Sequence, residues 1–438
     1  MPGVKDKSLS LVSLDRMNHM LKGPIARGTL GTTGALGLRV VLQASTLIIL
    51  ARILGPSGIA SYIALGGLAV LFGTLATGGT HLALLRDLSR QPSRGSSALR
   101  MPLGTTVATG SGLLAIYVFL SHVALGHLDP SGLVALCLGT SELLLQPLLL
   151  VWAQTFHARG QVVRSQLLLA LPLGFRLLIA ACVAWIAPSH PLEVFAAGHL
   201  LAVSAALGLA VAGARRTWPA PSSWRIATWT EWKDSVRYAL VAVGASGLSE
   251  LDKILAARIL APGMAGAYSA ASRVAGALVM PVAAMMSAAM PRLFRGSADP
   301  SRELKLHLWL LGSATGWGVV AAGAAWLVSP FLGPLFGQGY VLSGESLRWL
   351  AWAIPAIALR TTAANILMTQ ERPGSRLVVE IGGWLLLALL AWRLAIPNGL
   401  QGMAVALVVT EWVTASCSWA AVMLGKQHRN TAGRSDHP

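Results

Sequence analysis

Residues 51–62 read ARILGPSGIASY, and residues 257–268 read ARILAPGMAGAY. Six of these twelve positions are identical at a constant offset of 206 residues, and Arg86 falls on Arg292 by the same offset. The chain therefore looks like two copies of one unit, each about half its length. In a strongly apolar sequence, such repetition is typical of a transporter whose substrate path lies between the halves.

Composition and hydropathy indicate a helical membrane protein. Hydrophobic residues make up 54% of the 438 residues and charged residues only 12%, whereas soluble domains carry about twice that charged fraction. Mean hydropathy is +0.63, and apolar runs of roughly 18 to 25 residues recur, each long enough to cross the hydrocarbon layer. The alternating pattern of an outer-membrane β-barrel is absent. We predict an all-α polytopic protein with about twelve spans, at residues 28–51, 58–82, 103–125, 130–152, 165–187, 191–213, 236–260, 264–290, 306–329, 346–369, 377–396 and 399–424.

The distribution of Lys and Arg predicts the orientation of these spans, because cytoplasmic segments carry an excess of both. The segment before the first span, alternate loops and the carboxyl tail together hold 25 of the 34 cationic residues, while the opposite side has four. We therefore expect both termini on the cytoplasmic side of the inner membrane. The net charge of +17 follows from this bias and favours contact with anionic lipid. Nucleic acid is not an expected partner, since no basic soluble domain is visible to bind it.

An even number of spans in each half predicts a parallel repeat. Both halves then enter the membrane from the same side, with the repeat axis along the membrane normal. The expected parts are a basic amino-terminal segment (1–27), a first six-helix lobe (28–213), a cytoplasmic linker (214–235), a second six-helix lobe (236–424) and a cytoplasmic tail (425–438).

Prolines mark turns and possible breaks in the spans. Pro56 and Pro262 each end a helix in the repeated turn, and neighbouring small residues permit a tight reversal into the next span. Four further prolines fall within spans, where they can kink or locally unwind a helix: Pro147, Pro172, Pro281 and Pro355.

Five cations lie inside the predicted spans. Each costs about 2.5–3.5 kcal/mol on insertion scales, so each must face a hydrated cavity or an acidic partner. Our principal hypothesis is a cationic chamber between the halves that receives an anionic substrate, because the arginine fork suits phosphate. The candidate cavity cations are Arg39, Arg176, Lys253, Arg273 and Arg360.

Ion pairing is the alternative interpretation. Counted from the turn near residue 159, Glu142 and Arg176 lie at similar depth and are a candidate pair. We predict that the group around Lys253 is a polar lining rather than a set of closed pairs, since sequence neighbours point in different directions on a helix. Arg39 and Arg360 have no obvious acidic neighbour at matching depth. The acids available for ion pairs, or for binding a coupling cation or proton, are Glu142, Glu250, Asp252 and Glu411.

Sequence motifs for enzyme chemistry are missing. The chain has no Walker A sequence, no GxGxxG after a strand, no HExxH and no paired CxxC. Its three cysteines all fall within spans, where small core side chains are the simplest explanation. We therefore expect no enzyme activity, no catalytic residues, no cofactor and no metal site.

Four stretches carry a resemblance to a known family. Residues 47–86 contain an A-R-x-L-G-P turn, a Tyr, glycines and a terminal Arg, and residues 250–276 contain the matching start of the second half. The turns HARGQVVRSQ (157–166) and QERPGSRLVVE (370–380) are similar to its cytoplasmic turns. Together they resemble the polysaccharide flippases of the multidrug/oligosaccharidyl-lipid/polysaccharide exporter superfamily, especially the O-antigen and exopolysaccharide translocases.

The resemblance implies a V-shaped bundle of two lobes that opens alternately to each side of the membrane. It implies a cargo as well, an oligosaccharide linked through pyrophosphate to a polyprenyl lipid and moved from the inner to the outer leaflet. Implied partners are membrane lipids and the polysaccharide polymerase and chain-length machinery. Family members that act on the peptidoglycan precursor tend to have two further helices, which argues against that role here.

Three other functions remain open. A cation-coupled exporter of small cationic or apolar drugs, from the same superfamily, should have a cavity dominated by acidic and apolar groups. A non-transporting membrane scaffold of a polysaccharide assembly complex would need no cations at mid-membrane depth. An enzyme of lipid-linked sugar synthesis would need a clustered set of carboxylates or histidines, which the sequence does not show.

Overall fold

The computed structural model describes residues 24–126, 131–214, 217–295, 300–337, 339–369 and 373–435. Most of the predicted amino-terminal segment and the last three residues lie outside these ranges. Within them every regular element is helical. The first half contains α2 (Pro24–Ala76), α3 (Thr80–Arg90), α4 (Arg100–Leu125), α5 (Gly132–Thr140), α6 (Gln146–Ala158), α7 (Val162–Ile186) and α8 (Pro191–Gly213). The second half contains α9 (Trp229–Ile259), α10 (Pro262–Arg295), α11 (Pro300–Val328), α12 (Leu332–Phe336), α13 (Val341–Leu350), α14 (Ile354–Thr369) and α15 (Pro373–Ser435).

The twelve predicted spans all fall on helices of the structure. In the described residues, nine helical stretches are long and apolar enough to cross a membrane. Two of them, in α2 and α15, contain two predicted spans each, and they bend at Gly55 (φ 65°) and Gly399 (φ 55°). The one remaining predicted span, 236–260, lies in α9, which is richer in charged residues. The all-α polytopic fold is therefore confirmed.

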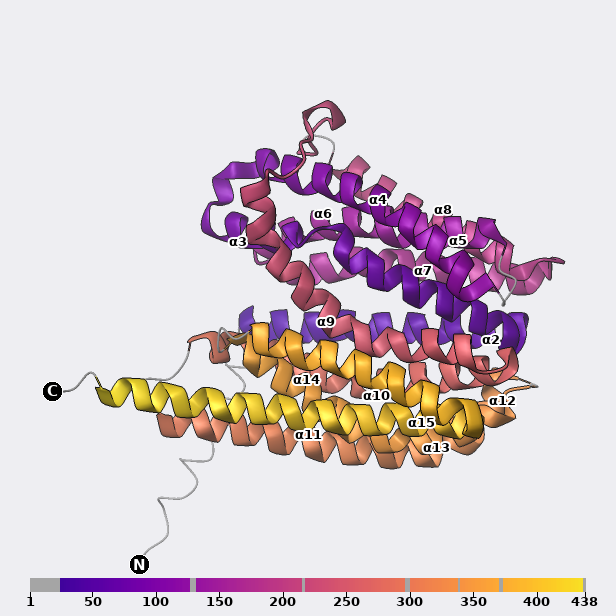
Figure 1. Cartoon of the computed structure of the whole chain (residues 1–438). Coiled ribbons are helices and arrows are strands. Elements are labelled where there is room, and N and C mark those ends of the chain that lie inside the picture. The colour runs from indigo at the N-terminus through magenta and orange to yellow at the C-terminus, as the bar shows by residue number, and fades with distance from the viewer. Residues whose placement is uncertain are drawn as a thin grey trace, which may run out of the picture.

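The helices form two lobes that converge at one end (Figure 1). The lobe drawn above contains α3 to α8, the lobe below contains α10 to α15, and α2 and α9 lie between them. We call the end that holds the repeated turns 51–62 and 257–268 the turn end. The opposite end, where α2 begins and α15 finishes, is the terminal end, and there the lobes diverge.

The two copies of the repeated turn pack against each other at the turn end. A Cβ on Gly266 of the second copy would overlap the carbonyl oxygen of Pro56 in the first, so the two backbones touch there. Around this contact, one apolar cluster joins both halves, with Leu50 and Ile59 from the first and Tyr268 from the second. The sequence repeat therefore forms the junction between the lobes.

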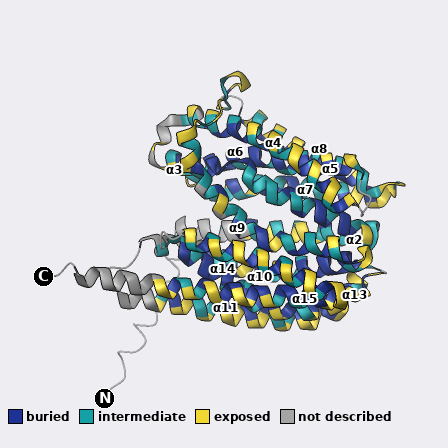
Figure 2. Cartoon of the chain, in the orientation of Figure 1, coloured by how far each residue is buried: buried dark blue, intermediate teal, exposed yellow. Residues whose placement is uncertain are grey.

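Exposed residues lie along the outward sides of the helices (Figure 2), and many of them are large and apolar. Trp326 on α11 and Trp392 on α15 are each more than half exposed. A water-soluble protein rarely exposes so many large apolar groups, whereas a surface that faces lipid tails favours them. The exposed surface thus agrees with a multi-pass membrane protein.

The linker between the halves is shorter than predicted. Helix α9 begins at Trp229, inside the predicted linker 214–235, because Thr228 and Glu231 form a capping box at its start. The T-x-x-E spacing was the available sequence signal for this helix start. The linker lies on α4, where the hydroxyl of Thr105 accepts a hydrogen bond from the backbone N–H of Ala227 (2.8 Å).

The contact at Gly266 predicts how a single methyl group changes stability. In Gly266→Ala the new Cβ overlaps the carbonyl oxygen of Pro56, so the two turns must move apart. We expect a lower midpoint of thermal unfolding in detergent, equivalent to about 1–3 kcal/mol, the usual cost of overpacking. Gly263→Ala is the matched control, since a Cβ there meets nothing within 4 Å. Equal midpoints for both variants would show that the turns do not touch.

Candidate functional site

Four of the five predicted cavity cations form ion pairs with the four predicted acids. Each pair joins one cation to one acid, so the charges balance pair by pair. Pairing is expected where few water molecules reach the charges, because an isolated charge is costly there. The pairs are Arg176–Glu142, Lys253–Asp252, Arg273–Glu250 and Arg360–Glu411.

In the first lobe, Glu142 accepts two contacts on the same oxygen. The guanidinium of Arg176 on α7 donates to Oε1, and His199 Nε2 on α8 lies 3.3 Å from that atom. The pair that the depth argument proposed is therefore confirmed. His199, only 2% exposed, was missed, although a histidine inside the apolar span 191–213 was a visible signal.

A π-helical turn places Glu142 in this cluster. Residues Ser141–Leu145 form that turn between α5 and α6, and Pro147 follows it. Proline has no N–H to donate to the carbonyl four residues earlier, which is that of Leu143, so the regular helix cannot continue there. Gly110 of α4 approaches the Leu143 carbonyl so closely that a Cβ would overlap it. Such turns often occur at functional sites.

In the second lobe, Arg273 of α10 binds Glu250 of α9 through both of its terminal nitrogens, at 2.9 and 2.8 Å. This bidentate geometry is among the strongest charge-assisted contacts in proteins. The Arg273 side chain is nevertheless 38% exposed, while that of Glu250 is 8% exposed. Arg273 is therefore paired but still accessible.

The prediction of an open polar lining around Lys253 was wrong. Lys253 Nζ lies 3.0 Å from Asp252 Oδ1 and also donates to the backbone carbonyl of Ser249. The long, flexible lysine stem folds back along its own helix, a possibility that a comparison of helix directions overlooked. Asp252 Oδ2 accepts further hydrogen bonds from Tyr268 (3.2 Å) and Ser272 (2.7 Å). Both side chains are paired and buried.

The prediction that Arg360 has no acidic neighbour was also wrong. Arg360 on α14 binds Glu411 on α15 through two contacts, at 2.6 and 3.1 Å, and both residues are buried. A 3₁₀ turn (Ala351–Ala353) interrupts this span just before Pro355. The two halves thus each have a fourth span that is interrupted beside a proline and carries a buried charge, as is typical of transporters.

Arg39 differs from the other cations. It lies midway along the first arm of α2, and its Nη1 donates to the neutral amide oxygen of Gln166 on α7, at 3.0 Å. No carboxylate among the residues that the structure describes pairs with it. Arg39 is half-buried, so it is the cation most available to an anionic ligand.

The two lobes bring their ion pairs toward each other across the second arm of α2. A Cβ at Gly67 would lie 3.1 Å from Glu250 Oε2, so this arm contacts the Arg273–Glu250 pair directly. On the same arm, Tyr62 packs on Phe195, whose ring centroid lies 6.3 Å from that of His199, the neighbour of Glu142. We call the pairs Arg176–Glu142 and Arg273–Glu250, together with His199 and Tyr62, the charged belt.

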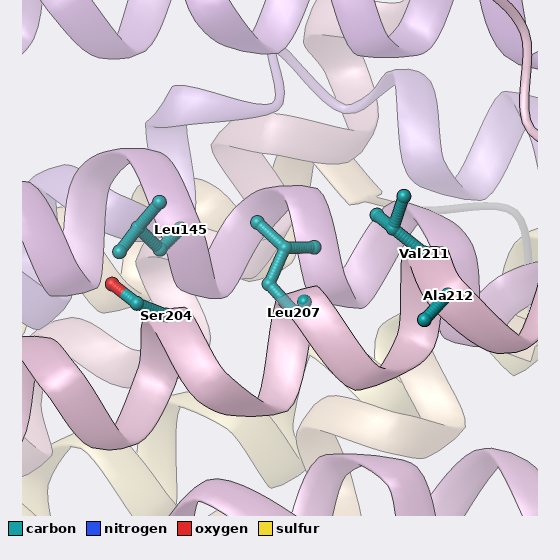
Figure 3. Close-up of a pocket in the computed structure, with 6 residues that line it drawn as sticks. Leu145, Ser204, Leu207, Val211 and Ala212 are labelled. Atoms are coloured by element: carbon teal, nitrogen blue, oxygen red, sulfur yellow. The ribbon is translucent and has the colours of Figure 1, made fainter.

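A groove of about 460 Å³ lies apart from the charged belt (Figure 3). Leu145 and residues of α8, including Leu207 and Val211, line it, and Ser204 supplies a hydroxyl. None of the ion-paired side chains lines this groove, so it is not part of the candidate site. Within the described ranges, no group of three or more His, Cys, Asp or Glu side chains could hold a metal ion.

Comparison with known proteins identifies the family. A family model described as "Polysaccharide biosynthesis protein" matches residues 25–297, more than half of the chain. The chain belongs to this polysaccharide biosynthesis protein family. No curated protein sequence matches it.

Solved transporters have the same fold as this polysaccharide biosynthesis protein. An inward-facing multidrug resistance MATE family transporter of the MOP superfamily matches with a TM-score of 0.71 and 14% identity, over 94% of this chain and 100% of the other. An outward-facing MATE structure gives 0.65 and 12% identity, over 95% and 98%. A MOP superfamily transporter from Pyrococcus furiosus, whose description reports "reverse polarity of binding pocket", gives 0.62 and 14% identity, over 92% and 95%. The twelve-helix architecture in two repeats is thus confirmed.

Among the residues that the structure describes, the lobes of this chain are in contact at one end of the bundle only. They meet at the turn end, through Gly266 and Pro56, and diverge at the terminal end (Figure 1). The bundle is therefore closed at the turn end.

The buried pair Arg360–Glu411 gives a stability prediction. In Glu411→Leu the Arg360 charge is left buried without a partner, a change that typically costs about 3–5 kcal/mol. The double variant Arg360→Met/Glu411→Leu removes both charges, so we expect it to recover most of the loss. The measurement is the midpoint of thermal unfolding in detergent. A single variant as stable as wild type would contradict the pairing.

Proposed function

We propose that this protein is a flippase that moves a polyprenyl-pyrophosphate-linked oligosaccharide from the inner to the outer leaflet of the cytoplasmic membrane. The family description supports a role in polysaccharide biosynthesis, and the fold is that of MOP superfamily transporters. The observation that carries the proposal is that two arginines remain available to a ligand, while every acid among the candidate residues is paired. Among the residues that the structure describes, Arg39 has only a neutral partner and Arg273 is accessible, whereas all four acids are already paired.

Pyrophosphate chemistry matches these two arginines. Each guanidinium presents donors in a planar fork that fits phosphate oxygens, and such contacts strengthen where water is scarce. Arg39 needs to give up only one hydrogen bond, to Gln166, in order to bind an anion. Arg273 can keep Glu250 on one side and present its exposed part to the ligand. The lipid chain would stay in the bilayer between the lobes.

The occupied acids disfavour the exporter of cationic drugs. Binding a cation needs a carboxylate with free oxygens. Each of Glu142, Glu250, Asp252 and Glu411 is already paired with a cationic side chain. In Glu250, Asp252 and Glu411 both carboxylate oxygens are bonded, so a cation would have to displace a partner there. Of the four acids, only Glu142 has an oxygen without a partner among the described residues. The MATE transporters that share this fold are described as multidrug resistance proteins, but the charges here favour an anionic cargo.

The proposed cycle starts from the observed shape. With the Lys- and Arg-rich segments in the cytoplasm, the terminal end is cytoplasmic and the lobes are open toward the leaflet where the cargo is made. Opening then requires the turns around Pro56 and Gly266 to separate while the terminal end closes. We expect the polysaccharide polymerase and the chain-length machinery to receive the cargo on the outer side.

A transport assay with two matched arginine variants tests this function. Wild type in proteoliposomes should expose the sugar of a polyprenyl-pyrophosphate-linked oligosaccharide on the far leaflet. Arg39→Gln removes the available charge, and Arg273→Lys keeps the pair with Glu250 but loses the fork. Because a hydrogen bond to a charged group contributes about 1.5–3 kcal/mol, we expect each variant to flip about tenfold or more slowly.

Arg164→Gln is the control, since Arg164 is exposed and bonds only Gln161. Full activity in all three folded variants would show that these arginines do not contact cargo. If wild type moves none of several such lipids, the flippase function is wrong, and the scaffold becomes the better interpretation.

A further inference from the structure

The sequence repeat places a tyrosine at the same position in each half, and the structure uses the two differently. Tyr268 is fully buried and its hydroxyl donates to Asp252 Oδ2, at 3.2 Å. Tyr62, its equivalent 206 residues earlier, is half-buried. Its hydroxyl has no hydrogen-bond partner among the residues that the structure describes. The same position thus has a structural role in one half and a free polar group in the other.

The ring of Tyr62 is held in place without its hydroxyl. It packs edge-on against Phe195 of α8, with ring centroids 5.4 Å apart and an interplanar angle of 80°. It also contacts two apolar clusters, each of which contains residues of both halves. A phenylalanine would pack equally well there. The Tyr62 hydroxyl is not enclosed as the unpartnered hydroxyl of Tyr340 is, so it is open to a ligand.

The position of Tyr62 relative to the charged belt suggests what that partner is. Phe195, on which Tyr62 packs, lies 6.3 Å between ring centroids from His199, the neighbour of the Arg176–Glu142 pair. Gly67, on the same arm as Tyr62, lies against Glu250, the partner of Arg273. Arg176 has donors to spare, since its buried Nε has no hydrogen-bond partner. An anion between Tyr62, Arg176 and Arg273 would therefore meet donors from both lobes.

We propose that the Tyr62 hydroxyl is a substrate-contacting group that donates to the anionic part of the cargo, between Arg176 and Arg273. This inference rests on the proposed function, and it adds a neutral donor that sequence reasoning did not find. Hydrogen bonds from O–H groups to anionic oxygens are short and strong. Because Tyr62 lies where the lobes meet, the contact links cargo binding to both of them.

Binding of farnesyl pyrophosphate to the purified full chain in detergent tests the proposal. Farnesol, with the same chain but no charge, measures binding through the lipid alone. We expect Tyr62→Phe to weaken farnesyl pyrophosphate binding about tenfold, the worth of one hydrogen bond to a charged group. Its thermal unfolding midpoint and its affinity for farnesol should equal those of wild type.

Tyr268→Phe is the matched control. It loses the same atom at the equivalent position, but there the hydroxyl bonds Asp252, so the unfolding midpoint should fall. Affinity for farnesyl pyrophosphate should change less than in Tyr62→Phe.

Two results would overturn the assignment of Tyr62 alone. One is wild-type affinity in Tyr62→Phe. The other is a fall in its unfolding midpoint as large as that of Tyr268→Phe, which would make the hydroxyl structural. If wild type binds farnesyl pyrophosphate no better than farnesol, the anionic cargo is wrong, and the proposed function fails together with this inference.

Discussion

A charge inside the hydrocarbon layer must find an opposite charge, and this requirement determines how the spans of this protein pack. Three of these pairs join helical segments that are neighbours in the chain. Arg176 of α7 meets Glu142 beside α6, Arg273 of α10 meets Glu250 of α9, and Arg360 of α14 meets Glu411 of α15. Breaking any one of them would leave a buried charge, so the pairs fix the relative position of the helices within each lobe. Arg39, which has no acidic partner among the described residues, and Arg273, which stays accessible, are therefore the cations available to an anionic ligand.

Because the chain is a repeat, equivalent positions in its two halves can be compared. Both copies of the turn meet at Pro56 and Gly266, and both fourth spans are interrupted near a proline. The charges differ, however, since the first lobe places an acid in that span and the second places an arginine. Tyr62 and Tyr268 differ likewise. In a structure built by duplication, functional roles are expected where the copies have diverged, because the shared framework already accounts for packing.

Much of the fold could be predicted from the sequence, since spans of about twenty apolar residues and an offset of 206 are direct signals. The Arg176–Glu142 pair was also predictable, because both residues can be counted from one short turn. Arg360 and Glu411 are 51 residues apart, with the bend at Gly399 between them. The membrane depth of one could therefore not be inferred from the position of the other. The sequence also did not show which face of each helix points toward its neighbours. That is why the contact between Gly67 and Glu250, and the free hydroxyl of Tyr62, emerge only from the structure.

The central claim is that the two lobes rock so that the turn end opens as the terminal end closes when an anionic lipid binds between them. The most direct measurement uses two spin-label pairs at exposed positions, Ser189 with Val341 at the turn end and Arg159 with Leu424 at the terminal end. Distance distributions are recorded with and without farnesyl pyrophosphate. We predict that the two distances shift in opposite directions, one end closing as the other opens. If both distances stay fixed, or both move in the same direction, the alternating-access account is wrong.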